Sequence, residues 1–378
     1  MTSADAIRFS VQAELPPEQI ALFWRTLEAR SDATLFLTWH WMNAWIATLG
    51  APPPLLIGEA SGRPILLGFV VPFRRREAGL IRADGLRLHS IGNWEQDCIA
   101  IEYNGFLVDR DWSGRAEQAA ISWLLDQRDV ARLRPNELHI TAMLDQYRET
   151  WTPPGTVIQI PNRKPSWRVD LAAIRASGRK YLETLSANAR QQIRRSMRLY
   201  DDAGGLTATW ASDVPTGFSF LDGLKDLHQH QWTARGERGG FASPFFEKFQ
   251  RRLLADCLPN GTVEIVRINR GAEPIGYLYN LLWRGHVFAF LSGLLYEPDN
   301  RLKPGLVCHT LCIEHHLRTG KHTYDFMAGD FRYKRTLGQP GPEFIYLLIQ
   351  KNTPAARFEH GLRRARDRLR NMARNRDI

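Results

Sequence analysis

The chain has 378 residues, of which 44% are hydrophobic and 24% are charged, a composition that excludes disordered and fibrous proteins. Its length allows two domains, or one large one, with a substantial core. Fifty Lys and Arg residues against forty Asp and Glu give a net charge of +10. That excess suits an anionic partner such as a phosphate-bearing ligand, RNA or a membrane surface, and it suits a basic solvated surface equally well.

Nothing in the sequence predicts secretion or membrane insertion. The four cysteines follow no disulfide spacing, and the N-terminus lacks the basic and then apolar segments of a signal peptide. The longest apolar runs, such as residues 64–73, are far shorter than the ~20 residues of a membrane helix. The sequence therefore predicts a cytoplasmic protein without a transmembrane segment.

The first half of the chain alternates helical and strand-like patterns. A helix is expected at about 17–30, and the apolar residues Leu37, Trp41, Trp45 and Leu49 predict a second helix because they repeat every four positions. Two apolar runs around the turn 61–63 predict a hairpin. Further strands are expected at 86–91, 99–108 and 137–143, and a helix at 114–127.

A Pro-, Gly- and Asn-rich stretch at 151–167 marks the best boundary, and the second half repeats the order of the first in outline. Its expected elements are a basic helix, a strand, two helices, a hairpin, a strand, a helix and two strands, at 177–202, 206–210, 215–234, 244–258, 262–283, 286–295, 306–320, 322–327 and 343–350. We predict an α/β (α+β) fold of two half-domains, each a mixed, mostly antiparallel sheet flanked by helices. The predicted domains are 1–163, 164–353 and a basic C-terminal helix at 354–378.

The stretch 288–338 carries the candidate chemistry. A strand runs into a loop with Arg301 and Lys303, and Pro304-Gly305 then begins a helix. The free N–H groups of a helix N-terminus favour an anion, and glycine lets a phosphate approach the backbone. The alternative interpretation is a Pro-Gly turn before an ordinary helix.

Four polar residues beyond this helix suit proton transfer. A tyrosine such as Tyr333 can return a proton to a leaving thiolate, and Lys334 can bind phosphate or a carboxylate. Asp325 or Asp330 can take a proton from an attacking amine or hydroxyl. The alternative is a charged loop in which Asp and Lys pair with each other.

Two clusters suit substrate binding. Arg190, Arg194 and Arg198 repeat every four residues, a stripe that fits an anionic substrate or RNA, or else a solvated helix face. His228 and Trp232 share a helix face and would line an acceptor cleft, or else pack in the core.

Two other segments have alternative interpretations. Cys308, Cys312 and His315 lie on one side of a helix, but a tetrahedral zinc ion usually draws ligands from a second element, so we predict no metal. The basic run at the C-terminus suits peripheral contact with a membrane surface, or a docked terminal helix.

One set of residues occurs in the order of a known family: His228-x3-Trp232-x3-Gly236, Lys303-Pro304-Gly305-Leu306, Gly320, Asp325-Phe326, Gly329 and Tyr333-Lys334. On these residues the second half, roughly 169–350, resembles the acetyltransferase-like domain of proteins linked to bacterial cellulose and exopolysaccharide synthesis, within the GNAT superfamily. It is also similar to the Fem-type aminoacyltransferases, which add amino acids to peptidoglycan precursors from aminoacyl-tRNA. Both families are built of two GNAT-like halves.

The resemblance implies a donor site. The strand that includes Leu291, Ser292 and Gly293 would bind the acyl-pantetheine arm through its backbone. The loop before the next helix, with Gly305 and Leu306, holds the position of the pyrophosphate loop. It departs from the usual pattern of two small residues, since only one glycine is present.

The resemblance also implies a reaction. Tyr333 lies near the place of the proton-donating tyrosine of many GNAT enzymes, and Lys334 matches the family's Tyr-Lys pair. The implied function is acyl transfer from acetyl-CoA or another acyl-CoA to an amine or hydroxyl of a sugar or related small molecule, in polysaccharide biosynthesis. Three alternatives stay open: Fem-type transfer from aminoacyl-tRNA, a non-catalytic accessory protein of polysaccharide export, and a metal-binding regulator.

Overall fold

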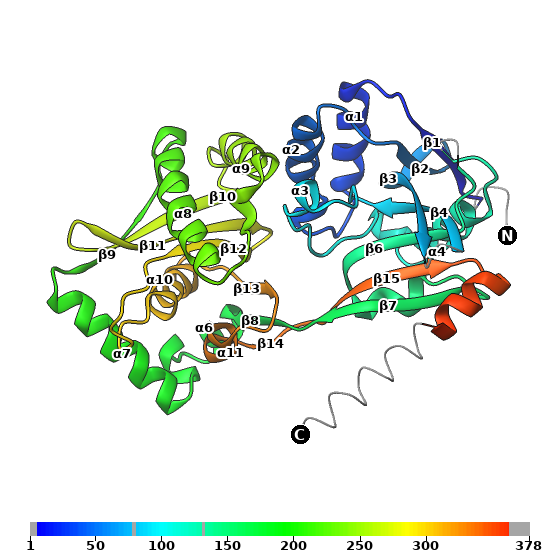
Figure 1. Ribbon diagram of the computed structural model, residues 1–378. Helices are drawn as coiled ribbons and strands as arrows, with labels where there is room; N and C mark the ends of the chain where they lie inside the picture. Colours follow the sequence, from blue (N-terminus) through cyan, green and yellow to red (C-terminus); the bar gives the residue numbers. More distant parts are fainter. Residues whose placement is uncertain (1–5, 78–80, 131–132, 363–378) are drawn as a thin grey trace.

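Two sheets, each flanked by helices, stand side by side in the computed structural model, which describes residues 6–77, 81–130 and 133–362 (Figure 1). Within these residues the first sheet has eight strands in the order β1-β2-β3-β4-β6-β15-β7, with β5 beside β3. They are β1 Arg8–Gln12, β2 Leu55–Ala60, β3 Arg63–Glu77, β4 Ile81–Leu88, β5 Leu107–Val108, β6 Glu137–Leu144, β7 Val157–Lys164 and β15 Phe344–Gln350. Only the β4–β6 pair is parallel among these described strands.

The second sheet has seven strands in the described chain, in the order β14-β8-β13-β12-β11-β10-β9. They are β8 Ser166–Asp170, β9 Leu206–Trp210, β10 Val263–Arg270, β11 Glu273–Trp283, β12 His286–Leu294, β13 Thr323–Ala328 and β14 Gln339–Pro340. The helices are α1 Pro17–Glu28, α2 Trp39–Leu49, α3 Trp94–Asp97, α4 Arg115–Asp126, α5 Arg148–Trp151, α6 Leu171–Ala176, α7 Ala187–Asp202, α8 Val214–Ala234, α9 Pro244–Cys257, α10 Pro304–Arg318 and α11 Arg332–Leu337.

Both halves follow one plan. A hairpin, a third strand, a helix and a strand parallel to the third occur as β2-β3-β4-α4-β6 in the first half and as β10-β11-β12-α10-β13 in the second. The predicted fold of two mixed sheets flanked by helices is confirmed.

Two expected elements differ in extent because of local backbone geometry. The helix expected over 177–202 begins only at Ala187, as α7, because Gly178 has a left-handed φ of 68° just after α6 and the Ser186 hydroxyl caps α7. Most of the strand expected at 99–108 is a loop, in which Ala100 and Tyr103 have left-handed φ values of 53° and 51°. Such angles interrupt a strand.

The chain passes between the sheets twice. It leaves the first sheet at the end of β7 and enters the second with β8, on either side of Pro165. Near the C-terminus it returns, and β15 lies between β6 and β7 in the first sheet. The last strand of the stretch predicted as the second domain thus belongs to the first sheet, and the division at 163/164 remains a prediction.

An apolar core joins the halves through α2 and α9, which lie side by side in Figure 1. Trp41 of α2 is fully buried, and its ring lies 4.9 Å from that of Phe249 in α9 and 5.6 Å from that of Phe290 in β12. Phe36 meets Phe288 of β12 at 5.6 Å in the same way. Trp41 of the fourfold apolar set thus packs on the other half of the molecule, while the ring of Trp45 packs on Phe69 of the first half.

The chain after β15 docks on the first sheet. Residues 354–362 are helical, and the buried Glu359 accepts hydrogen bonds from Arg75 at 2.9 Å and from Gln350 at 3.2 Å. The rest of the predicted basic helix, 363–378, lies outside the described residues. No helix in the described part of the chain has the length and apolarity needed to cross a bilayer.

Replacing Trp41 by Ala should lower the free energy of unfolding by about 3–5 kcal/mol, because it empties the contact between the halves. Urea unfolding followed by circular dichroism measures this. Leu22→Ala is the control, since Leu22 is 64% exposed, and it should change stability by less than about 0.5 kcal/mol. Equal losses in both variants would contradict a core shared by the halves.

Candidate active site

Strands β12 and β13 separate after a short parallel pairing, and a cleft opens where they part. Their register joins 286–288 to 323–325 and ends there. In β12, Phe290 is an extra residue without a partner in β11, a bulge that bends the strand. In β13, Met327 has a left-handed φ of 62° and interrupts the register with β8.

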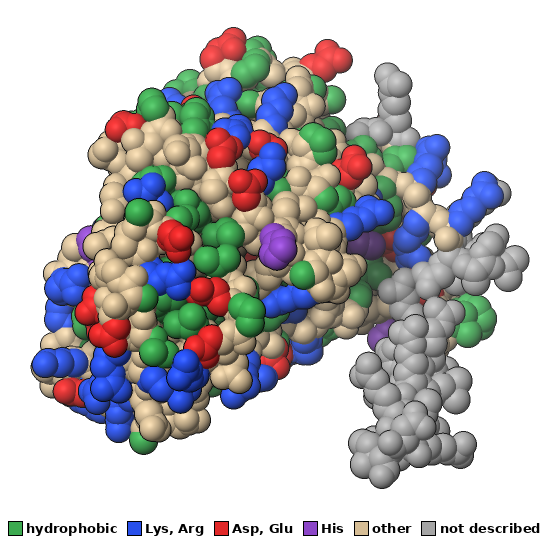
Figure 2. Space-filling view, turned by 60° about the vertical axis from the view of Figure 1, so that its left-hand side comes forward, with side chains coloured by type: hydrophobic (Ala, Val, Ile, Leu, Met, Phe, Trp, Pro, Cys, Tyr) green, Lys and Arg blue, Asp and Glu red, His purple; other side chains and the backbone are tan. Residues whose placement is uncertain are grey.

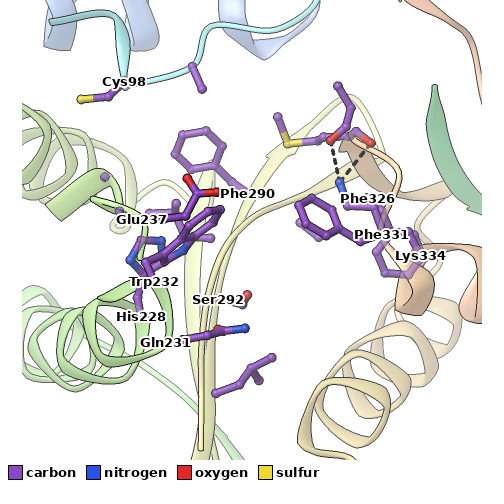
Figure 3. A pocket seen from close by; sticks show the side chains of 18 of the residues that line it. Cys98, His228, Gln231, Trp232, Glu237, Phe290, Ser292, Phe326, Phe331 and Lys334 are labelled. Atoms are coloured by element: carbon purple, nitrogen blue, oxygen red, sulfur yellow. Dashed lines mark hydrogen bonds between the residues drawn. The ribbon is translucent and has the colours of Figure 1, made fainter. Parts of the chain in front are cut away.

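A central cavity of about 680 Å³ lies at this separation (Figure 3). Its walls come from β12 and β13, from α8 and the loop behind it, from α10 and α11, and from the first half. They include Trp94, Cys98, Glu102, His228, Trp232, Glu237, Phe290, Leu291, Ser292, His309, Phe331, Tyr333 and Lys334. Aromatic walls with a few polar groups are typical of a small-molecule site.

Six predicted site residues meet at this cavity: Leu291, Ser292, His228, Trp232, Tyr333 and Lys334. His228 is buried and its ring lies 5.8 Å from that of Trp232. Burial lowers the pKa of His228 to about 4, so the imidazole is neutral near pH 7.

Lys334 secures the separated end of β13. Its side chain is buried, and Nζ donates to the backbone oxygens of Met327 at 3.3 Å and Ala328 at 2.7 Å, the two dashed lines of Figure 3. Burial lowers the pKa of Lys334, while the carboxylates of Glu102 and Asp325 oppose that shift. The ammonium group therefore serves first to fix the backbone of the cleft.

The first half supplies two groups that sequence reasoning missed. Tyr103 donates a short hydrogen bond to one oxygen of Asp325, whose other oxygen accepts from the Met327 amide at 2.6 Å. Glu102 lines the central cavity and accepts from the Ala328 amide at 2.9 Å. Burial raises the pKa of both carboxyl groups, Glu102 and Asp325. Glu102 and Tyr103 lie in a loop that is distant in sequence from β13, so no local pattern could connect them to the site.

Tyr333 stacks on a buried histidine. Its ring lies 5.2 Å from that of His309, at an interplanar angle of 9°. Nδ1 of His309 lies 2.9 Å from the Tyr324 hydroxyl, and Nε2 has no partner within the described chain. Burial lowers the pKa of His309 to about 3 and raises that of Tyr333, so the imidazole is neutral and the phenol protonated.

A second cavity of about 870 Å³ adjoins the first. We call it the helix-end cavity, because the first residues of α7 and α10 line it. Both cavities share Arg235, Tyr296, Phe331 and Tyr333, and the helix-end cavity adds the predicted Lys303, Gly305 and Leu306, with Arg332 and Arg335. Two helix N-termini beside several cations make this cavity suited to an anion.

Two predicted charges do not line these cavities, and each is held in an ion pair. Arg301 folds back on Asp299 at 2.7 Å and lines neither cavity, so only Lys303 of the two loop cations reaches the helix-end cavity. Asp330 is exposed and pairs with Arg335 at 2.8 Å. In both cases a carboxylate and a guanidinium a few residues apart form an ion pair with each other, so neither charge is directed to a ligand site.

Three other predicted residues also lie outside the cavities. Arg194 and Arg198 are exposed on α7 and line neither cavity. Figure 2 shows Lys and Arg side chains gathered at the lower left of its face, with acidic side chains among them. A side chain at Gly293 would place Cβ 2.3 Å from the Leu224 carbonyl oxygen, so this glycine lets α8 pack closely on β12.

The two cysteines of α10 are part of the core, whereas His315 is half-buried. Cys308 and Cys312 are fully buried, and burial raises the pKa of both thiols. Among the residues that the structure describes, no three His, Cys, Asp or Glu side chains are arranged to hold a metal ion.

Comparison with known proteins identifies the second half. Residues 187–335 match the model of the acetyltransferase (GNAT) domain family. The second half thus contains an acyltransferase domain of the GNAT type. The matched segment includes α7, β12, α10 and Tyr333, which are the elements around both cavities.

Solved structures share the fold over most of the chain. FemX is 11% identical with a TM-score of 0.54, over 92% of this chain and 99% of that chain. L-PGS from Bacillus licheniformis is 12% identical with a TM-score of 0.53, over 90% of this chain and 94% of that chain. No curated protein matches. The likeness to Fem-type proteins is thus confirmed for the fold.

Replacing Lys334 by Met should lower the free energy of unfolding by about 1–3 kcal/mol, because two backbone oxygens lose a charged donor beside buried carboxyl groups. Urea unfolding measures this. Lys248→Met is the control, because Lys248 is exposed on α9. A stability loss no larger than that of the control would show that Lys334 does not hold β13 in place.

Proposed function

We propose that this enzyme transfers an acyl group from acyl-CoA to an amine or hydroxyl of a sugar or related metabolite, as a cytoplasmic enzyme of polysaccharide biosynthesis. The observation that carries the proposal is the cleft between β12 and β13, which adjoins an anion-suited cavity and an aromatic one. A donor with phosphates at one end and a thioester at the other would lie along that cleft.

The helix-end cavity fits the phosphates of coenzyme A. Lys303 and Arg332 line it beside the N-termini of α7 and α10, whose first N–H groups lack partners inside their helices. Gly305 lines the same wall, where a side chain would approach Leu294 at 3.3 Å. The residues present therefore suit the donor, although the loop has one glycine only.

The thioester would lie at the bulge of β12. The extra residue Phe290 interrupts the ladder with β11, and N–H groups at such a bulge can polarise a carbonyl oxygen. The attacking nitrogen or oxygen forms a bond to the acyl carbon, and the carbon–sulfur bond breaks. Tyr333, which lines both cavities, gives its phenolic proton to the leaving thiolate.

The central cavity would hold the acceptor. Trp94, Trp232 and Phe331 offer aromatic faces, and Glu237 and Ser292 offer polar groups. A sugar ring has apolar faces and a polar edge, so it suits walls of both kinds.

A second candidate is transfer from aminoacyl-tRNA, as the Fem-type resemblance implies. The exposed Arg194, Arg195 and Arg198 favour it, because they lie on α7, whose first residues line the helix-end cavity. An RNA longer than the cavity could pair its phosphates with this stripe.

Calorimetric titration with acetyl-CoA and with free coenzyme A tests the proposed donor. We expect micromolar binding that weakens about 10–100-fold in Lys303→Ala, since a charge-assisted contact contributes about 1.5–3 kcal/mol. Arg301→Ala is the matched control and should bind as the wild type does. The absence of binding by the wild type, together with binding of charged tRNA that is lost in an Arg194→Ala, Arg198→Ala variant, would favour the second candidate.

Tyr333→Phe should lower kcat by about 10²–10⁴-fold while the melting temperature stays unchanged, because it removes only the proton donor and keeps the ring stacked on His309. Release of free coenzyme A, detected with a chromogenic disulfide, measures kcat. A variant as active as the wild type would remove Tyr333 from the reaction.

A further inference from the structure

The two halves have equivalent clefts, but only one of them is open. In the first half the parallel register of β4 and β6 ends at Leu88 and Ile140, as that of β12 and β13 ends at Phe288 and Asp325. Two residues beyond each last pair, the second strand has a left-handed residue, Ala142 with φ 48° and Met327 with φ 62°. The first half thus retains the strand separation that forms the cleft of the second.

Asn104 fills the cleft of the first half. It is 2% exposed, and its side-chain nitrogen donates to the Leu88 carbonyl oxygen at 3.0 Å, on β4. Its backbone N–H donates to the Ala142 carbonyl oxygen at 3.2 Å, on β6. Its side-chain oxygen lies 3.0 Å from Nδ1 of the buried His89. Polar groups of both separated strands are thus bonded to Asn104 of the chain itself.

The residues just before Asn104 extend into the other half. Tyr103 reaches Asp325, and Glu102 reaches the Ala328 amide, both on β13. The loop therefore bridges the closed cleft of the first half and the open cleft of the second.

We infer that the first half completes the site of the second half. Asn104 anchors the loop that carries Glu102, and Glu102 takes the proton of the attacking amine or hydroxyl. This inference rests on the proposed acyl transfer. Asp325 has both carboxyl oxygens engaged, by Tyr103 and by the Met327 amide, and it does not line the central cavity. Glu102 lines the cavity, and its one bond to the Ala328 amide leaves the second oxygen for an acceptor.

The charges around Glu102 suit this task. Lys334 of α11 and Lys164 at the end of β7 act on it as cations, and Asp325 of β13 acts as an anion. Burial is the largest influence and raises the pKa of Glu102 to about 7. A base with a pKa near the working pH combines a populated carboxylate with useful basicity.

The step balances without another reactant. The acceptor N–H or O–H gives its proton to the Glu102 carboxylate as the nitrogen or oxygen bonds to the acyl carbon. The carbon–sulfur bond breaks, and the thiolate takes its proton from Tyr333.

Glu102→Gln tests the role, because the amide oxygen still accepts from Ala328 but cannot take a proton. Acetyl-CoA serves as the donor probe and methyl glucoside, whose hydroxyl groups do not titrate near pH 7, as the acceptor probe, with release of free coenzyme A as the readout. We expect the wild-type kcat/KM to fall as the pH is lowered through about 7. Glu102→Gln should be about 10²–10⁴-fold slower at pH 8 without this pH dependence, and should still bind coenzyme A.

Three variants complete the design. Glu149→Gln changes an exposed carboxylate of α5 and should retain wild-type rates. Glu102→Asp should keep part of the activity and the fall at acidic pH, and it is the test variant if Glu102→Gln does not fold. Asn104→Ala should lower kcat with the affinity for coenzyme A unchanged, because it releases the anchor of the loop.

Two results would overturn the inference. One is a Glu102→Gln enzyme within about threefold of the wild-type rate, and the other is an unchanged acidic fall in that variant. A wild type that releases no coenzyme A from acetyl-CoA would instead remove the proposed function, and the role of Glu102 with it.

Discussion

The apolar contact between the halves is the constraint on which the site depends. Trp41 packs on Phe249 and on Phe290, the bulged residue of β12. A shift of α2 would therefore move the bulge and the cavity wall together. Because the contact belongs to a core that both halves share, the central cavity can draw its walls from both without a mobile interface between them.

The return of β15 to the first sheet strengthens this arrangement. Strand β15 returns to the first sheet directly after α11 and β14, so the segment that carries Tyr333 and Lys334 lies where the chain passes back from the second sheet to the first. Lys334 then ties α11 to the separated end of β13. The pairing of β15 with β6 and β7 and the buried ammonium group of Lys334 together fix the geometry of the cleft.

Much of the fold could be predicted from the sequence, because periodicity reports on local structure. The fourfold apolar spacing predicted α2, and the hairpins and the helix after Lys303 follow from turn residues and Pro-Gly. Periodicity does not say which sheet a strand joins, so β15 could not be placed. Periodicity also does not show which charged neighbour a side chain will pair with. Arg301 forms an ion pair with Asp299, two residues away, and not with a ligand site. Glu102 had no signal, since its partners on β13 lie more than two hundred residues away in the chain.

We propose one donor site, in the second half, completed by the first. A crystal structure of the protein soaked with coenzyme A would show where the donor binds. We expect one molecule per chain, with phosphates in the helix-end cavity beside Lys303, the pantetheine arm between β12 and β13, and the sulfur near Phe290 and Tyr333. Coenzyme A bound between β4 and β6, with Asn104 displaced, would contradict it.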